Sequence, residues 1–269
     1  MQYEPIKKSL GRVFAKSIFL RKTFYFLLDL LLLRTWYVKK ALKKTASSLP
    51  ENATVLDAGS GFGQYSWRMS GRHKNWNIKA VDIKKEDIDE CNKFFSRTGR
   101  ADRVRFEAAD LTFFSEKDAY DFILTVDVME HIERDDLVFS NFYNSLKSNG
   151  ILMISTPSDQ GGSDVHNHED YSFIDEHVRD GYGIDEIVHK LKKAGFRKVE
   201  AQYTYGWAGG ISWKLSMKYP VKMINISYLI FIILPFYYLL AFPFSFFLNI
   251  IDLNSRNDKG TGLVVLAYK

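Results

Sequence analysis

From Ala53 onward the chain alternates short apolar runs with longer polar stretches, and this rhythm limits its possible folds more than any other feature. The apolar runs end at or near Gly, Asp or Pro, which is typical of buried strands. Most of the polar stretches carry apolar residues at helical spacing. Alternation of this kind predicts an α/β fold with a parallel sheet covered by helices on both faces. The expected strands are 54–59, 78–83, 104–111, 120–128, 150–157, 197–206 and 262–269.

Three polar stretches have the spacing of amphipathic helices: 85–97, 133–147 and 184–195. The last ends at Gly195, because glycine readily adopts the left-handed conformation of a helix C-cap. With 269 residues the chain can hold one sizeable α/β domain and additions to it. Its single cysteine, Cys91, excludes an internal disulfide and is expected to be a small residue of the helix at 85–97.

The first 44 residues differ from the rest of the chain in charge. They contain eleven basic and two acidic side chains, a net charge of +9, whereas the remaining residues carry a net −4. This division predicts an anionic partner, either nucleic acid or a membrane surface, and large residues such as Phe14, Ile18 and Phe19 favour lipid. The apolar run 24–33 is too short to span a bilayer and contains Asp29. Residues 1–48 are therefore predicted to form basic amphipathic helices.

A glycine-rich loop, GSGFG, follows the first predicted strand. Its glycines allow a sharp turn and the close approach of a ligand, and the helix N-terminus that follows favours negative charge. The second predicted strand ends near Asp82, 21 residues after Gly61, where a carboxylate can accept hydrogen bonds from both ribose hydroxyls. The third ends near Asp110, which is placed to meet an adenine amino group. These features predict a nucleotide-containing cofactor.

Two classes of cofactor compete for such a loop. A dinucleotide fingerprint has the spacing G-x-G-x-x-G, in which the third glycine allows close helix packing. Here the spacing is G-x-G-x-G, and Tyr65 and Ser66 follow it. Asp57 lies two residues before the first glycine, where a carboxylate would repel a pyrophosphate and could hold a cationic amino group. S-adenosylmethionine carries an amino group and a sulfonium, so it is the favoured cofactor.

The motifs VLDAGSGFG, AVDI, AADL, DVMEHI and GILMISTPS resemble, in order and spacing, those of class I S-adenosylmethionine-dependent methyltransferases. The resemblance covers about residues 50–206 and 262–269. It implies a Rossmann-like seven-stranded sheet whose last strand is antiparallel, with S-adenosyl-L-methionine as the cofactor. The residues expected to bind the cofactor are Asp57, Gly59, Ser60, Gly61, Gly63, Tyr65, Asp82, Ile83, Asp110, Leu111 and Asp127.

The motif DVMEHI, with the later EHVRDGYG and a helix ending in AGF, resembles the branch of ubiquinone-pathway O-methyltransferases. The N-P-P-Y type tetrapeptide of enzymes that methylate amino groups on bases is absent after the fourth predicted strand. The resemblance therefore implies a small-molecule acceptor, and no nucleic acid partner is expected.

Methyl transfer needs an acceptor atom in line with the methyl group, and often a base that removes its proton. His131 follows the fourth predicted strand at the sheet edge where ligands bind, and is the first candidate base. Glu130 and His177 are further catalytic candidates. For His131 and Glu130, a structural hydrogen bond at a helix start is the alternative.

The loop at 158–183 follows the fifth predicted strand and is expected to lie over the cofactor as part of a substrate lid. His166 and His168, with carboxylates nearby, could bind a divalent metal. A solvated lid explains the same composition, so no metal site is predicted. Arg179 is, like His177, a candidate for substrate contact.

The segment 223–251 contains no formally charged side chain, and nine of the twenty residues from Tyr228 to Phe247 are aromatic. By length it is a transmembrane candidate. However, if the last strand pairs with the strand at 197–206, the chain must return to the side it left, and two crossings would need about 40 residues. Pro235 and Pro243 are expected to break a straight helix. We therefore predict a kinked hairpin within one leaflet; a buried lid or a dimer interface is the alternative.

The predicted organisation is a segment of N-terminal helices at 1–48, a methyltransferase core at 49–206 plus 261–269, and a membrane-associating insert at 207–260. The predicted activity is methyl transfer to a hydroxyl or carboxyl of a hydrophobic, lipid-like molecule, on the cytoplasmic side of a membrane. Carbon methylation or cyclopropanation of a lipid chain is one alternative. A non-catalytic, membrane-recruited cofactor-binding protein is another, and the sequence does not predict an oligomeric state.

Overall fold

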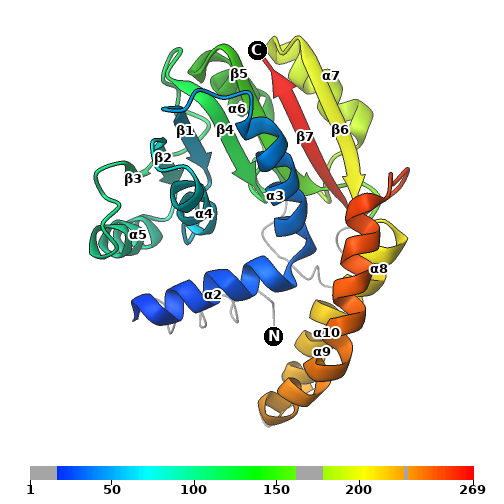
Figure 1. Ribbon diagram of the computed structural model, residues 1–269. Helices are drawn as coiled ribbons and strands as arrows, with labels where there is room; N and C mark the ends of the chain where they lie inside the picture. Colours follow the sequence, from blue (N-terminus) through cyan, green and yellow to red (C-terminus); the bar gives the residue numbers. More distant parts are fainter. Residues whose placement is uncertain (1–16, 162–177, 227–229) are drawn as a thin grey trace.

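The computed structural model describes residues 17–161, 178–226 and 230–269, and its centre is one seven-stranded sheet (Figure 1). The strand order is β3-β2-β1-β4-β5-β7-β6. Pairing is parallel from β3 to β5, whereas β7 runs antiparallel to both β5 and β6. The predicted sheet with an antiparallel last strand is therefore confirmed. The strands are β1 Thr54–Ala58, β2 Asn77–Asp82, β3 Val104–Ala108, β4 Tyr120–Val126, β5 Leu146–Pro157, β6 Lys198–Thr204 and β7 Gly262–Tyr268.

Helices cover both faces of the sheet, because side chains alternate along each strand and both sets are apolar. On β4, Phe122 and Leu124 belong to one buried cluster and Ile123 to the other. The first cluster joins the sheet to α3, α4 and α5, and the second joins it to α6 and α7. These helices are α3 Leu33–Ala46, α4 Gln64–Arg72, α5 Lys85–Arg97, α6 Asp135–Ser145 and α7 Ile184–Ala194.

The ends of two elements test the sequence predictions closely. Gly195 caps α7 with φ +116°, and a Cβ there would lie 2.7 Å from the ring of Tyr143, so the predicted C-cap is confirmed. The strand expected at 150–157 instead begins at Leu146. Leu146 pairs with Tyr120 and is fully buried, and the register between β4 and β5 shifts after this pair. A polar stretch, Lys147–Gly150, therefore belongs to the strand, whereas the sequence predicted a helix up to 147 and a strand only from 150.

The N-terminal helices α2, Ile18–Leu31, and α3 are separated by Leu32, which has an extended backbone. The helices predicted at 1–48 are thus present over the described part of that range. Val38 of α3 is completely buried in the first cluster. By contrast, α2 leaves Phe19 and Phe26 more than 60% exposed on its outer side. Figure 1 shows α2 lying beyond the end of the sheet where the parallel strands finish.

A helical hairpin projects from the same end of the sheet, between β6 and β7 (Figure 1). Its first arm consists of α8 Trp207–Trp213, a π-helical stretch η2 Lys214–Lys218 and α9 Tyr219–Ile226. Its second arm is the single helix α10 Ile230–Asn254, which packs on all three. The chain therefore leaves the core and returns to it on the same side, as expected from the pairing of β6 with β7.

The prediction of a kinked hairpin within 223–251 was wrong in its internal structure. Pro235 and Pro243 both lie inside α10, which continues through them. Each proline costs a helix about 3 kcal/mol. The packing of α10 against the first arm offsets this cost: for example, Tyr237 and Tyr238 donate hydrogen bonds of 2.7 Å to the carbonyls of Leu215 and Ser216. The first arm, most of which precedes the segment 223–251, leads away from the core, and α10 returns to it.

Candidate functional site

The glycine-rich loop lies at the carboxyl end of β1, and its backbone requires glycine at two positions. Gly59 has φ +77°, and a Cβ there would lie 2.2 Å from a methyl group of Val128. Gly63 has φ +74° and begins α4, with the ring of Phe106 3.0 Å from where its Cβ would be. The amides of Gly59 and Ser60 donate to the carbonyl of Val81 at 2.8 and 2.9 Å, so the loop is held against β2.

Asp82 ends β2 beside this loop. One of its carboxylate oxygens accepts a hydrogen bond of 2.8 Å from the amide of Gly61, and the other accepts one of 3.0 Å from the amide of Lys84. Ile83, next in the chain, is 70% exposed, so it offers an apolar surface beside the carboxylate. The arrangement places a fixed carboxylate and an exposed apolar side chain together, as a ribose and an adjoining base require.

Asp57 lies on the inner side of the loop and is almost completely buried. It accepts a 2.6 Å hydrogen bond from the hydroxyl of Ser66, so it ties β1 to α4. Burial raises the pKa of its carboxyl to about 6, and the charge of Asp82 acts in the same direction. The nearby hydroxyls of Ser60 and Tyr65 are buried and have no partner among the described residues. Such unsatisfied groups fit a site that a polar cofactor completes.

Asp110 and Leu111 follow β3. The carboxylate of Asp110 accepts hydrogen bonds from the amide and the hydroxyl of Thr112, at 2.8 and 2.7 Å. Leu111 is buried in the second cluster. Asp127 follows β4 with φ +51°, and its amide donates to the carbonyl of Ser155 at 2.8 Å. The predicted cofactor residues therefore gather along the carboxyl edge of β1 to β4, although their contacts with a cofactor stay a prediction.

The catalytic candidates lie in different environments. Glu130 and His131 belong to a single 3₁₀ turn, η1 Met129–His131, just after Asp127. Glu130 is 1% exposed and accepts a 3.1 Å hydrogen bond from the hydroxyl of Thr156, a geometry that suits a structural role. His131 has an exposed side chain at the end of the turn. His177, like His166 and His168, lies outside the described residues, and the described ones contain no cluster of metal ligands.

The family model for the methyltransferase domain matches residues 31–201, from the last residue of α2 to within β6. The chain belongs to the methyltransferase domain family. The family match and the sheet topology identify a class I S-adenosylmethionine-dependent methyltransferase domain. Solved structures of the same fold hold S-adenosylmethionine or S-adenosylhomocysteine. The glycine loop, Asp82 and the unpaired buried hydroxyls of Ser60 and Tyr65 fit this cofactor.

Relatives of this methyltransferase modify different atoms. It is 28% identical over 129 residues to a ubiquinone biosynthesis O-methyltransferase of Pelagibacter ubique, covering 46% of this chain and 52% of that one. It is also 28% identical over 152 residues to a phosphoethanolamine N-methyltransferase of Triticum aestivum, covering 55% and 28%. The chain thus spans about half or less of these relatives' lengths.

Among solved structures, phosphoethanolamine N-methyltransferase 2 of Haemonchus contortus, in complex with S-adenosyl-L-methionine, matches with a TM-score of 0.61 at 18% identity. The match covers 87% of this chain and 52% of that one. A [4+2]-cyclase matches at 15% identity with a TM-score of 0.57, covering 86% and 80%. At these identities the likeness shows the fold alone, and the cyclase illustrates that the fold does not determine the reaction.

The N-terminal helix α2 contacts the glycine-rich loop closely, which the sequence did not predict. Arg21 of α2 is 4% exposed and donates hydrogen bonds to the carbonyl of Phe62, at 2.8 Å, and to the thiol of Cys91, at 2.9 Å. The hydroxyl of Tyr25 donates to the same carbonyl. Burial raises the pKa of the Cys91 thiol to about 12, so it is not a reactive thiolate. Part of the basic segment therefore holds the loop.

Arg34, at the start of α3, is the second residue that sequence reasoning missed. Its guanidinium forms an ion pair with Asp127, and its amide donates a 2.8 Å hydrogen bond to the hydroxyl of Tyr205. In the sequence, Arg34 stands out only as a basic residue directly after the apolar run 24–33. Arg179, a candidate for substrate contact, instead pairs with Asp135 at 2.7 Å. Tyr182 and Lys190 also bind Asp135, so this cluster joins α6, α7 and the segment before α7.

Proposed function

We propose that this methyltransferase transfers a methyl group to a hydroxyl or carboxyl of a hydrophobic, lipid-like molecule at the cytoplasmic surface of a membrane. The observation that carries the proposal is an exposed apolar surface at the end of the molecule where the cofactor residues gather. When bound, S-adenosylmethionine supplies an electrophilic methyl group. The residues of the chain would hold the cofactor, bring the acceptor to it and remove the acceptor's proton.

The apolar surface is mainly one face of α10. Seven of its large side chains are between 54% and 73% exposed: Ile232, Ile233, Phe236, Leu239, Leu240, Phe244 and Phe247. Most of them recur at intervals of three and four residues and so form a stripe. Of the described helices, only Ile232–Asn254 is long and apolar enough to cross a membrane, and just 17% of its most apolar window is buried. Soluble monomers rarely expose a large, contiguous apolar surface, which supports a lipid partner for this face of α10.

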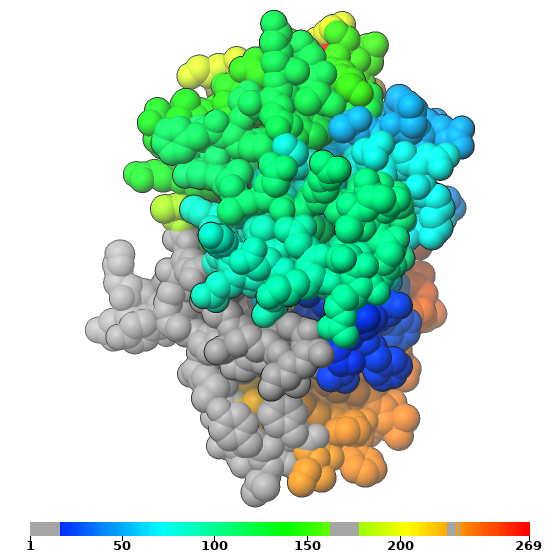
Figure 2. All heavy atoms as spheres, turned by 90° about the vertical axis from the view of Figure 1, so that its left-hand side faces the viewer, coloured from blue at the N-terminus to red at the C-terminus, as the bar shows by residue number. Residues whose placement is uncertain are grey.

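The position of this surface links it to the cofactor site. The hairpin joins the sheet through β6 and β7, and α2 lies at the same end of the molecule (Figures 1 and 2). Phe19 and Phe26 of α2, the helix that holds the glycine loop, are also exposed. Basic side chains lie along the first arm of the hairpin and after α10, where they can meet anionic lipid head groups. They are Lys214, Lys218, Lys222, Arg256 and Lys259.

Oxygen is the proposed acceptor atom for two reasons. The motif DVMEHI resembles that of O-methyltransferases, and the Pelagibacter relative is an O-methyltransferase by its name. His131 is the proposed base, since it is exposed and lies four residues beyond Asp127. Nitrogen methylation is the second candidate, since the wheat relative methylates phosphoethanolamine nitrogen by its name.

The test uses the protein with methyl-labelled cofactor and a total lipid extract, followed by identification of the labelled product. We expect a labelled ether or ester that partitions into organic solvent. Alkaline hydrolysis separates the two, because it releases the label from a methyl ester and not from a methyl ether. A labelled product that is a water-soluble methylamine would contradict the proposal, and label transfer to nitrogen of a lipid would support the second candidate.

A further inference from the structure

The helix α2 turns a polar stripe toward the core of the molecule. The stripe consists of Arg21, Tyr25 and Asp29, which follow one another at intervals of four residues and so lie on one face of the helix. Arg21 and Tyr25 are almost completely buried, and the side chain of Asp29 is 18% exposed. On the outer side, Phe19 and Phe26 are exposed. An ordinary amphipathic helix buries apolar side chains, so these inward polar groups require specific partners.

The partners lie on both sides of Gly63. The two almost completely buried members of the stripe both donate hydrogen bonds to the carbonyl of Phe62, the arginine at 2.8 Å. Asp29 accepts a hydrogen bond of 2.9 Å from the side-chain amide of Gln64. Between these two contacts, Gly63 has a left-handed backbone and begins α4. The helix α2 therefore holds the chain immediately before and immediately after the turn that ends the glycine-rich loop.

The two carboxylate oxygens of Asp29 have different partners. Oδ1 accepts the hydrogen bond from Gln64. Oδ2 forms ion pairs with Arg68 of α4 and, at 3.6 Å, with Lys39 of α3. These two cations balance a charge whose partial burial would otherwise be unfavourable. Asp29 thus connects three helices, and of its contacts only the one with Gln64 lies next to the turn.

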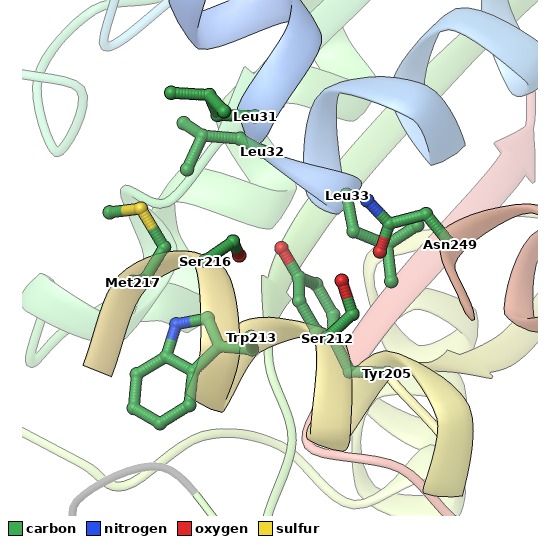
Figure 3. A pocket seen from close by; sticks show the side chains of 9 residues that line it. All are labelled: Leu31, Leu32, Leu33, Tyr205, Ser212, Trp213, Ser216, Met217 and Asn249. Carbon is green, nitrogen blue, oxygen red and sulfur yellow. The ribbon is translucent and has the colours of Figure 1, made fainter. Parts of the chain in front are cut away.

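The carboxyl end of α2 is anchored by packing. Leu31 and Leu32, at the junction with α3, line one narrow gap together with Trp213 of the hairpin's first arm (Figure 3). The backbone is extended at Leu32 and helical on either side of it. The junction therefore fixes one end of α2, and the polar stripe holds the rest of the helix against the glycine-rich loop.

The polar stripe lies outside the region that the family model matches. That region is 31–201, and Arg21, Tyr25 and Asp29 all precede it. In the sequence, Asp29 interrupts the apolar run 24–33. A carboxylate in such a run is unfavourable unless it has partners, so the contacts with α3 and α4 account for its presence. The support that α2 gives to the loop is thus added to the matched domain from outside.

We infer that Asp29 is a positioning residue for the cofactor, which acts through Gln64 on the turn at Gly63. Glycines allow a loop many conformations, and a loop that is already held in its binding conformation has less entropy to lose when the ligand binds. Asp29 does not need to touch the cofactor for this effect. The inference concerns S-adenosylmethionine alone, so it does not depend on which acceptor is methylated.

The test is calorimetric titration of the full chain with S-adenosylhomocysteine. We expect Gln64→Leu and Asp29→Leu each to weaken binding about tenfold, because each removes the same hydrogen bond. The double variant should bind no more weakly than Asp29→Leu, since the bond is lost only once, whereas independent effects would multiply. Losses that multiply, or folded single variants that bind as tightly as the wild type, would overturn the inference.

Two further variants separate positioning from stability. Arg68→Met removes the ion pair and keeps the hydrogen bond between Asp29 and Gln64, so its affinity for S-adenosylhomocysteine should fall much less than that of Gln64→Leu. Lys147→Met removes an ion pair of 2.8 Å with Asp121, near the start of β4 and at the opposite end of the sheet, and should bind like the wild type.

The melting temperature completes the comparison. Gln64→Leu and Lys147→Met should each lower it by at most about 4 °C, because each removes one partly exposed polar contact. A loss of affinity in Gln64→Leu alone would then support positioning, and it decides the question even if Asp29→Leu does not fold. An equal loss of affinity in Arg68→Met and Gln64→Leu would show that α2 is only fastened to the core, and the inference would be wrong.

Discussion

Single residues along the carboxyl edge of the sheet make the most direct predictions about the cofactor. Asp82 holds the amide of Gly61 with one oxygen, and we expect its carboxylate to bind the ribose hydroxyls. Asp82→Ala should weaken S-adenosylhomocysteine binding by about 1.5–3 kcal/mol, roughly 10- to 150-fold. Calorimetry measures this loss, and Asp89→Ala, an exposed carboxylate on α5, serves as the control. Binding of NADH without binding of the homocysteine nucleoside would contradict the cofactor site.

The buried carboxyl of Asp57 predicts a dependence of stability on pH. Its pKa is raised by burial to about 6, above the value in an unfolded chain, so the folded state holds the proton more tightly. The resulting stabilisation is complete below about pH 4 and is lost as pH rises through 6. We expect the free energy of unfolding to fall by about 3 kcal/mol over this window through Asp57 alone. Urea denaturation of the wild type and Asp57→Asn should differ in this slope; parallel curves would be inconsistent with it.

The proposed role of His131 as the catalytic base can be tested by substitution. If it is the base, His131→Ala should lower turnover of the lipid product about 100-fold or more and leave S-adenosylhomocysteine affinity nearly unchanged. Product formation with labelled cofactor and calorimetry together make the distinction. Near-normal turnover would assign His131 a structural role, and His177→Ala would then be the variant to measure.

At the scale of elements, we expect Arg21 of α2 to hold the glycine-rich loop in its conformation. Arg21→Met keeps the length of the side chain and removes its hydrogen bonds to Phe62 and Cys91. We expect the free energy of unfolding to fall by about 2–4 kcal/mol, because the buried carbonyls lose a charged donor. S-adenosylhomocysteine affinity should fall about tenfold as the loop loosens.

Lys22→Met is the matched control, since Lys22 is the exposed neighbour of Arg21 on the same helix. It should retain both stability and cofactor affinity. An Arg21→Met protein with lower stability and unchanged affinity would show that α2 supports the fold without tuning the cofactor site.

The elements also show which kinds of structure the sequence can predict. The strands, the helix ending at Gly195 and the antiparallel β7 follow from local patterns and from motif order, and all are present. The course of α10 through Pro235 could not be predicted, because the compensating contacts come from the first arm of the hairpin. The pairing of Arg34 with Asp127 joins residues 93 positions apart in the chain, and no local pattern encodes such a contact.

At the scale of the whole molecule, we expect the protein to fractionate with membranes. Attraction between basic side chains and anionic lipid, about 1 kcal/mol per residue near the surface, weakens at high salt. The contact of the α10 stripe with lipid is apolar, so it should survive a high-salt wash and yield to detergent. Replacing Phe236, Leu240, Phe244 and Phe247 with serine should release most of the protein, as measured by flotation with liposomes.

Phe113→Ser is the control for that measurement, because Phe113 is 86% exposed but lies after β3 and far along the chain from the hairpin. It should leave flotation unchanged. A wild-type protein that stays monodisperse without detergent and does not float would make the hairpin an interface between proteins. A label added from the far side of the membrane that reaches Pro235–Tyr238 would replace the one-leaflet arrangement with a full crossing.

The insertion point of the hairpin has a consequence for how such an enzyme can diversify. Thr204 and Gly262 form the last pair of the β6–β7 ladder, so the connection that contains the hairpin starts and ends at two residues that the sheet already holds side by side. Lengthening a connection whose ends are fixed costs little, about 0.6 kcal/mol for each doubling of a flexible loop. Whole helical turns can therefore be added to or removed from the hairpin without a change in strand register. The length of the hairpin and the cofactor site of the core can thus vary as independent traits.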